Sequence, residues 1–369
     1  MVDELEGGAR QKESTLALVR ARKYLERRFG SVFVNFGEPI SLAQRLEGRR
    51  ELFTSEESPE VASGRRALTE ALGNEIVERI NWAMVANSTS VAAAALLGEP
   101  RRGMFRRELT QRMGEVVDLL RLQDVQMTPA LVRDEGEFNE SIGFLLRAGL
   151  IKSESDPRGE ILYYEESRRR ALDVYRNVLF HFLVAPSLLA HRLQPGATLG
   201  ELREDLGFWL DLLYQEFFAP KGTVLGLQLD AFLDYFERIG VLESSDHRFR
   251  VTEKGQGYLG FLAEQTRSLI EAYYTACSTI LELLEPSTAK QLEKSAEEQF
   301  ARAHLLGEVQ RPEGWNPVTF RNALDLLTRR GILETVAGEK DRERSYARGP
   351  AFEDLAGLRE RLAAVLVAR

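Results

Sequence analysis

The stretch FLLRAGLIKSESDPRGEILYY, Phe144–Tyr164, contains the end of an amphipathic helix, a glycine, a short apolar strand, a polar turn and a second strand. The same order recurs in YFERIGVLESSDHRFRVT, residues 235–252, and in LLTRRGILETVAGEKDRERSYA, residues 326–347. A glycine at this point lets the helix end in a left-handed residue before the chain turns into the strand. Similarity at a fixed period indicates a triplicated unit, and three unrelated helix–hairpin pieces are the alternative. The glycines are spaced 91 residues apart, at Gly149, Gly240 and Gly331.

Each hairpin stretch is expected to lie between further helices. The upstream helices contain RRELTQRM, LGELREDL and AKQLEKSA, and the longer downstream helices cover about residues 166–193, 252–284 and 352–367. Two helices followed by a two-stranded hairpin form the outline of a winged helix. The sequence therefore predicts a mainly α, helical fold with three short β-hairpins in winged-helix-like repeats.

This outline raises the question of nucleic-acid binding. The helix before each glycine would read the duplex, yet that helix is net negative in the first two copies and net positive only in the third. The whole chain has a net charge of −8 at pH 7. Because negative helices are repelled by phosphates, no nucleic-acid partner is expected.

The composition is that of a soluble globular protein, with 44% apolar and 29% charged residues. Cys277 is the only cysteine, which excludes an internal disulfide and favours a reducing compartment. The four histidines have no partners at metal-ligand spacing, so neither a metal nor another cofactor is predicted. No signal-peptide pattern and no run of 18 apolar residues occurs in the sequence. A shallow interfacial membrane contact stays open as an alternative.

A different pattern, SVFVNFGEPISL, Ser31–Leu42, predicts a single strand with one apolar face that ends at Gly37 and Pro39. Since no later strand lies nearby, a sheet from elsewhere must satisfy its backbone. Around it we expect a helix over residues 11–29, a polar loop over residues 47–66 and helices over residues 67–97.

Several stretches in this order resemble bacterial glycerol-3-phosphate acyltransferases of the PlsB type and their mitochondrial relatives. They are ELEGGARQKES, Glu4–Ser14, followed by VFVNFGEPISL, Val32–Leu42; RINWAMVANSTSVAAAALL, Arg79–Leu97; and VYRNVLFHFLVAPSLLA, Val174–Ala190. The last is similar to that family's tyrosine–arginine–asparagine stretch with a histidine four residues later. The resemblance covers nearly the whole chain and weakens after about residue 200.

The resemblance implies an α/β acyltransferase domain followed by a helical C-terminal region. In that family a His-x-x-x-x-Asp motif supplies the general base for attack on an acyl thioester. None of the histidines here has an aspartate five positions later. We therefore interpret the chain as the family's C-terminal portion, expected to be inactive alone, and leave open whether it is itself an enzyme. The early strand would be the last strand of the α/β domain, with unpaired edges in this chain.

The expected organisation has five segments, of which the first is the remnant of the α/β domain and the second is a linker and helical connector. The other three are the winged-helix-like repeats. The segments cover residues 1–45, 46–100, 101–194, 195–285 and 286–369.

No catalytic, cofactor-binding or metal-binding residue is predicted. Arg176, Asn177 and His181 are interpreted as a buried polar network, with contact to the catalytic domain or substrate as the alternative. Glu38 is interpreted as a turn residue. ESRRRA, Glu166–Ala171, is interpreted as a solvated face, with a contact to anionic lipid headgroups as the alternative. The candidate structural or domain-contact residues are Phe36, Gly37, Glu38, Pro39, Tyr175, Arg176, Asn177 and His181.

By resemblance, the parent activity is acyl transfer from acyl-CoA or an acyl carrier protein to glycerol-3-phosphate, the first step of phospholipid synthesis. The implied partner is an upstream acyltransferase domain, in the same or a separate chain. The substrates would contact this chain only through that domain. Peripheral placement on the cytoplasmic side of the inner membrane is implied as well. The alternative function is a non-catalytic adaptor or regulator made of tandem winged-helix units.

Overall fold

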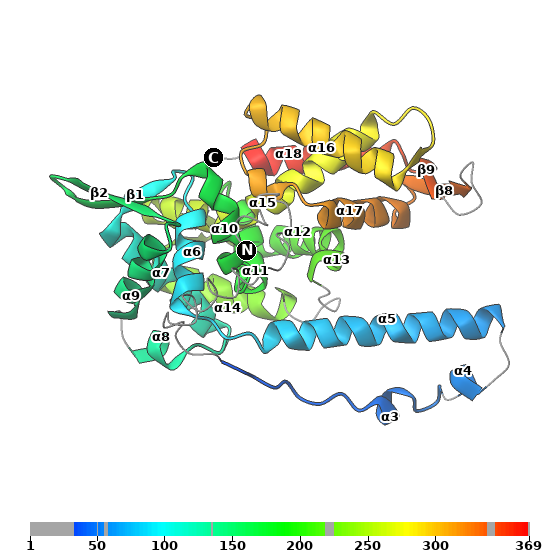
Figure 1. The fold of residues 1–369 in the computed structure, drawn as a ribbon, viewed down its shortest axis with the longest axis horizontal. Coiled ribbons are helices and arrows are strands. Elements are labelled where there is room, and N and C mark those ends of the chain that lie inside the picture. Colours follow the sequence, from blue (N-terminus) through cyan, green and yellow to red (C-terminus); the bar gives the residue numbers. More distant parts are fainter. Residues whose placement is uncertain are drawn as a thin grey trace, which may run out of the picture.

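The computed structural model describes residues 33–49, 51–54, 58–133, 136–217, 225–337 and 344–367. The fold is mainly helical, with three small antiparallel sheets, which confirms the predicted fold class (Figure 1). The α-helices are α3 (Leu42–Arg45), α4 (Glu51–Thr54), α5 (Pro59–Trp82), α6 (Ser88–Leu97), α7 (Arg106–Leu122), α8 (Pro129–Arg133), α9 (Gly136–Arg147), α10 (Arg169–Arg176), α11 (Phe180–Leu193), α12 (Leu199–Leu212), α13 (Tyr214–Phe217), α14 (Leu225–Arg238), α15 (Glu253–Leu281), α16 (Ala289–Leu305), α17 (Pro317–Arg329) and α18 (Asp354–Val367).

In each sheet, a hairpin pairs with a short strand that comes earlier in the chain, before the helices that lead to that hairpin. The first sheet contains β1 (Gly103–Phe105), β2 (Lys152–Asp156) and β3 (Gly159–Tyr163). The second contains β4 (Ala197–Thr198), β5 (Leu242–Ser245) and β6 (Arg248–Val251), and the third β7 (Ser287–Thr288), β8 (Leu333–Ala337) and β9 (Arg344–Arg348). Their strand orders are β1-β3-β2, β4-β6-β5 and β7-β9-β8. The predicted hairpins are confirmed, whereas the third strand of each sheet was not predicted.

The repeated glycines have the predicted role. Gly149, Gly240 and Gly331 have φ angles of 67°, 71° and 69°, in the left-handed region that residues with a Cβ rarely adopt. Each follows the helix that precedes a hairpin, and its backbone N–H bonds to a carbonyl of that helix's last turn. The assignment of the units as winged helices, and the five-segment division, stay predictions.

Helix α15 runs through the centre of the molecule and is buried along almost its whole length (Figure 1). Its first half belongs to a core shared with α6, α7, α9 and α11, and its second half to a core shared with α16, α17 and α18. Because one helix enters both cores, the similar units do not each enclose a separate interior.

Two predicted helical segments are interrupted. The segment 67–97 breaks at residues 83–87, where Ala86 forms a bridge with Met127 and Asn87 caps α6 by accepting from the Ser90 N–H. The segment 166–193 breaks between α10 and α11. The polar loop over 47–66 is also corrected: α4 lies within it, and α5 begins at Pro59 after the N-cap Ser58.

The predicted strand over Val32–Phe36 is wrong for its described residues, because residues 33–41 belong to no strand. The physical reason is that none of the described strands pairs with this stretch, so no ladder forms. The Asn35 side chain instead donates to the Ala83 carbonyl at 3.1 Å and to Gln126 Oε1 at 2.7 Å. The helix predicted over residues 11–29 lies outside the described residues.

None of the described helices combines the length and the apolar character needed to cross a bilayer. Cys277 lies inside α15 as a buried free thiol, and burial raises its pKa to about 12. It is therefore protonated at neutral pH and unsuited to thiolate chemistry.

Candidate functional site

The described part of residues 33–82 forms an extension that we call the arm. Helix α5 reaches beyond the rest of the molecule, and the chain from Phe33 to α4 runs beside it (Figure 1). Arg79 Nη1 donates to the Glu38 carbonyl at 2.6 Å, and Glu75 accepts from both Arg79 at 2.7 Å and Arg45 at 2.5 Å. Thus α5 holds the preceding chain mainly through one arginine–glutamate cluster.

The predicted contact residues of the FGEPI stretch are placed along the arm. Glu38 contributes its backbone carbonyl, which fits the turn interpretation, and Pro39 offers a second carbonyl to Arg79 at 3.5 Å. An ideal Cβ on Gly37 would lie 3.8 Å from the Arg79 carbonyl oxygen, so ordinary contact is available there. Phe36 has 88% of its surface exposed and lines a pocket together with Arg45, Glu75 and Arg79.

Exposed apolar side chains are concentrated on the arm. Of the sixteen large hydrophobic residues exposed in the described parts of the chain, nine lie there. A groove of about 820 Å³ between the 33–42 chain and α5 is lined by several of them, together with Leu72, Met84 and Val85. Such a contiguous apolar surface is typical of an interaction site rather than of a free face. The exposed residues are Phe33, Val34, Phe36, Leu42, Phe53, Ile76, Val77, Ile80 and Trp82.

The stretch Tyr175–His181 does not form one continuous helical face. Helix α10 ends at Arg176, Asn177 is its exposed C-cap, and α11 begins at Phe180. The interpretation of Arg176, Asn177 and His181 as one buried polar network is therefore wrong for Asn177, which is exposed because the chain turns there between the two helices. Tyr175 is half-buried and meets the Phe144 ring edge-on, with centroids 6.3 Å apart.

Arg176 belongs to a buried polar network, as interpreted from the sequence. Its guanidinium donates to the Gln265 carbonyl at 3.1 Å, forms an ion pair with Asp173 at 2.5 Å and lies 4.8 Å from the Phe180 ring centroid. Burial raises the pKa of Asp173 above its ordinary value in spite of this neighbouring cation. These contacts join α10 to α15 and stabilise helix packing.

His181 joins α11 to the end of α5. Its Nε2 lies 2.9 Å from the Asn81 carbonyl oxygen, and the ring lines a small apolar cavity of about 70 Å³ beside Trp82, Phe182 and Trp209. Burial lowers the pKa of His181 to about 4. A neutral, hydrogen-bonded imidazole with this pKa is a weak base at neutral pH.

We expect His181 to titrate near pH 4 rather than near its ordinary value of 6.5. Because the unfolded chain would bind the proton first, this residue makes stability fall as the pH decreases from about 6.5 to about 4. Two-dimensional NMR of labelled histidine side chains checks the value, with a short histidine-containing peptide as the control. A His181 midpoint near 6.5 would contradict the prediction.

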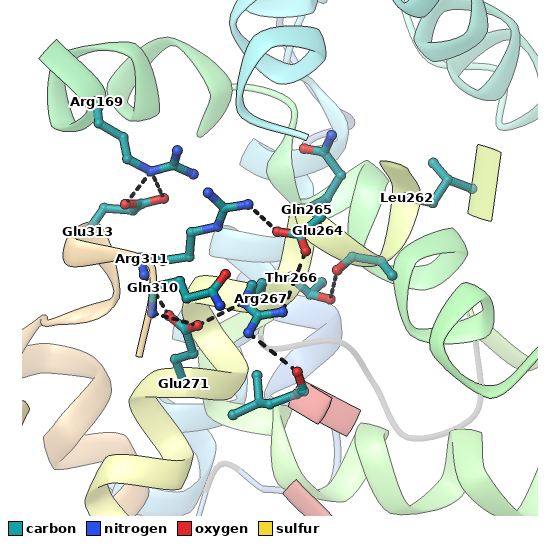
Figure 2. Close-up of polar contacts among 12 residues, drawn as sticks. Arg169, Leu262, Glu264, Gln265, Thr266, Arg267, Glu271, Gln310, Arg311 and Glu313 are labelled. Carbon is teal, nitrogen blue, oxygen red and sulfur yellow. Dashed lines mark hydrogen bonds and ion pairs between the residues drawn. The ribbon is translucent and has the colours of Figure 1, made fainter. Parts of the chain in front are cut away.

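A second set of polar residues lies in the protein interior, where α10, α15 and the chain before α17 meet (Figure 2). Arg169 Nε lies 2.8 Å and 2.7 Å from the two carboxylate oxygens of Glu313, and Arg169 also donates to the Tyr164 hydroxyl. The side chains of Arg169 and Glu313 are only 2% and 3% exposed. Burial by itself raises the pKa of Glu313, but the charge and hydrogen bond of Arg169, together with the charge of Arg176, hold that pKa below its ordinary value.

The remainder of this ionic cluster is built on α15. Glu271 accepts from Arg267 Nε at 2.8 Å and from the backbone N–H groups of Gln310 and Arg311 at 3.0 Å and 2.8 Å. The Arg311 side chain pairs with Glu264, which also lies 3.5 Å from Arg267. With the Arg176–Asp173 pair, the cluster contains four arginines and four carboxylates. It ties the third unit to the first two.

Sequence reasoning missed this cluster, although a signal was available. Glu264, Arg267 and Glu271 lie at i, i+3 and i+7 of a helix that is otherwise largely apolar there, so they share one buried face. The interpretation of ESRRRA as a solvated face is also corrected. Arg169 in its middle is buried because Glu313, 144 residues later, neutralises it.

Two further histidines, His191 and His304, are engaged in structural contacts. His191 Nε2 lies 3.1 Å from Thr266 Oγ1, and burial lowers its pKa to about 4. His304 Nδ1 lies 3.0 Å from the Val309 carbonyl oxygen. Within the described residues, the hydrogen bonds of these two rings are to a hydroxyl and a backbone carbonyl and not to a carboxylate. The arrangement favours packing and recognition over acid–base chemistry.

Comparison with known proteins matches residues 1–336 to the family model described as the glycerol-3-phosphate acyltransferase C-terminal region. Proteins named glycerol-3-phosphate acyltransferase from Pseudomonas entomophila (strain L48) and Pseudomonas putida (strain KT2440) are each 28% identical to this chain. These alignments cover 90% and 91% of the chain but 41% and 42% of the relatives. The chain therefore spans about two fifths of their length. On the extent of the family-model match, this chain belongs to the glycerol-3-phosphate acyltransferase C-terminal region family.

Proposed function

We propose that this chain is the non-catalytic C-terminal portion of a glycerol-3-phosphate 1-O-acyltransferase and that its arm binds the acyltransferase portion. The enzyme would transfer an acyl group from acyl-CoA or an acyl carrier protein to glycerol-3-phosphate in phospholipid synthesis. The observation that carries the proposal is the exposed apolar surface of the arm within a chain of this family. The substrates would be met only through the partner portion.

Three further points support this division of labour. In the relatives, the matched region is 41% or 42% of the length, so more than half of each relative lies outside it. The matched region is described as C-terminal. The remaining portion of the relatives therefore precedes it. The arm is formed by the first described residues of this chain. Its groove therefore lies toward the N-terminal side of the sequence, the side on which a preceding domain would join.

The first experiment measures acyl transfer from labelled acyl-CoA to glycerol-3-phosphate by the purified chain. We expect no product above the rate without protein, because the histidines with shifted pKa values are neutral structural residues. Turnover at a rate typical of enzymes, about 1 s⁻¹ or more, would refute the non-catalytic assignment.

The second experiment tests the arm with the portion of the Pseudomonas putida relative that this chain does not cover, expressed together with this chain. We expect the two to co-purify, and the double variant Ile76→Asp, Ile80→Asp to abolish co-purification because it places two charges on the exposed apolar face. Val318→Asp, which alters an equally exposed apolar residue on α17, is the matched control and should leave binding intact. Equal binding by all variants would contradict the assignment of the arm.

The proposal includes peripheral association with the cytoplasmic side of the inner membrane, which the family resemblance implies. Flotation with vesicles containing anionic lipid tests this part separately. The alternative function, a tandem winged-helix adaptor, is favoured by one observation, the common strand order of the three sheets. Binding of other proteins by the chain, without binding to the acyltransferase portion, would favour the adaptor.

A further inference from the structure

A pocket of about 680 Å³ lies on the side of the molecule where the three units meet. Its walls come from the end of α11 and the loop after it, from β6, from the first half of α15 and from Val365 of α18. This volume is within the range of small-molecule sites in proteins. The pocket is separate from the arm, since none of its lining residues belongs to residues 33–82.

The pocket is lined by an excess of positive charge. Arg248, Arg250 and Arg267 contribute three guanidinium groups, whereas Glu264 is the only carboxylate in the lining. That carboxylate is already paired with Arg311, outside the lining, and lies 3.5 Å from Arg267. In a chain with a net charge of −8, such a local excess of arginine is a departure from the overall balance and favours an anionic ligand.

Several donors of the pocket are unused. In the part of the chain that the structure describes, the side chains of Arg250, Gln194 and Gln256 have no hydrogen-bond or ion-pair partner. Arg248 is held at the rim by the Gly196 carbonyl at 3.0 Å and is 3.7 Å from Glu201. A phosphate group offers more acceptor oxygens than a carboxylate group. A phosphate is therefore the better match for a cavity lined by two side-chain amides and a guanidinium.

The inner wall of the pocket is rigid. His191 is fixed by Thr266, and Arg267 donates to Glu271 at 2.8 Å and to the Leu366 carbonyl at 3.3 Å. Of these residues, Arg267 and Glu271 belong to the ionic cluster that ties the third unit to α15 (Figure 2). The charged inner wall is thus positioned before any ligand arrives, and its outer wall retains free donors.

We propose that this pocket binds the phosphate group of a small phosphorylated ligand, with Arg248 and Arg250 as the principal anion-binding residues. Gln194 and Gln256 supply neutral donors, and Arg267 contributes positive potential from the inner wall. The site is independent of acyl transfer and of the arm. A bound phosphate would sit at the junction of the three units and stabilise their packing, because it binds the folded state only.

The test is isothermal titration calorimetry of the full chain with inorganic phosphate and with glycerol-3-phosphate, at ionic strength held constant with sodium chloride. We expect saturable binding, weakened about tenfold or more in the double variant Arg248→Ala, Arg250→Ala because two charge-assisted contacts are lost. Arg302→Ala, which removes a 66% exposed arginine on α16, is the matched control and should bind as the unaltered chain does. The single variant Arg250→Glu serves if the double variant does not fold.

A second measurement locates the ligand. The NMR signals of the His191 ring should shift on titration with phosphate, since His191 lines the pocket, whereas those of His304 should not. Absence of saturable binding by both soluble probes and by the vesicles described next would overturn the proposal. So would equal affinity of the double variant and the unaltered chain.

The phosphate could be carried by a soluble metabolite or by a lipid headgroup, and flotation distinguishes these sources. Vesicles of phosphatidylcholine with phosphatidic acid are compared with vesicles of phosphatidylcholine alone. Binding of soluble probes with no preference for the acidic vesicles supports a soluble ligand. Retention by the acidic vesicles that is lost in the Arg248→Ala, Arg250→Ala variant supports a lipid headgroup.

Discussion

Replacement of Glu313 by glutamine is expected to lower the free energy of unfolding by about 3–5 kcal/mol. The substitution keeps the size of the side chain but removes the charge that neutralises Arg169. Both side chains are almost fully buried, at 2% and 3% exposure, so the remaining guanidinium charge would be left in the interior without its counter-ion. Chemical denaturation followed by circular dichroism measures the change.

The matched control is an exposed ion pair. Lys294 and Glu298 on α16 lie 3.8 Å apart with 78% and 70% of their side chains exposed, and Glu298→Gln should change stability by no more than about 1 kcal/mol. The double variant Arg169→Met, Glu313→Leu should recover much of the loss, since buried pairs are often replaced by apolar residues without penalty. If Glu313→Gln were as mild as Glu298→Gln, the burial argument would be wrong.

The same pair gives stability a defined pH dependence. The pKa of Glu313 in the folded protein lies below its ordinary value of 4.5, because the charge and hydrogen bond of Arg169 and the charge of Arg176 together exceed the opposing effect of burial. The contribution of the Arg169–Glu313 pair to the free energy of unfolding is therefore present above pH 4.5. It is lost as the pH falls through the folded-state pKa of Glu313. The Glu313→Gln variant should lack this component of acid destabilisation.

Replacement of Gly255 by alanine is expected to destabilise the protein by about 1–3 kcal/mol. Gly255 lies in the first turn of α15. This turn packs against the backbone of Val241, the residue that follows Gly240. An ideal Cβ there would lie 2.9 Å from the Val241 carbonyl carbon and closer still to its oxygen. Because these are backbone atoms, relief requires the hairpin and the helix to move apart.

Gly257, two residues later in the same helix, provides the control with the opposite sign. Its face is exposed, and the nearest atom to an added Cβ would be Arg112 Nη2 at 3.9 Å. Gly257→Ala should therefore stabilise the protein by up to about 1 kcal/mol, because alanine has the higher helix propensity. Thermal unfolding of the two variants compares them directly, and a loss of stability in both would contradict the steric explanation.

The local features of the fold were accessible from sequence because they depend on neighbours in the chain. The three hairpins, the left-handed glycines and the helices around them follow from apolar periodicity and from the freedom of Gly149, Gly240 and Gly331. Strands β1, β4 and β7 were missed because two or three residues carry no periodic pattern, and only the pairing partner defines them. The break after Arg176 was missed for a related reason, since VYRNVLFHF contains neither a glycine nor a proline to mark a helix end.

The sequence by itself determined the mainly helical class, the repeated units and, through the resemblance, the family to which the chain belongs. Only the tertiary structure decided that Arg169 is buried, that the stretch after Val32 lies along α5 without forming a strand and that three arginines line one pocket. The physical reason is distance along the chain. Burial of a charge and convergence of donors are set by partners far along the chain, 41 residues away for Arg79 with Glu38 and 144 residues away for Arg169 with Glu313. These contacts are fixed only when the helices pack.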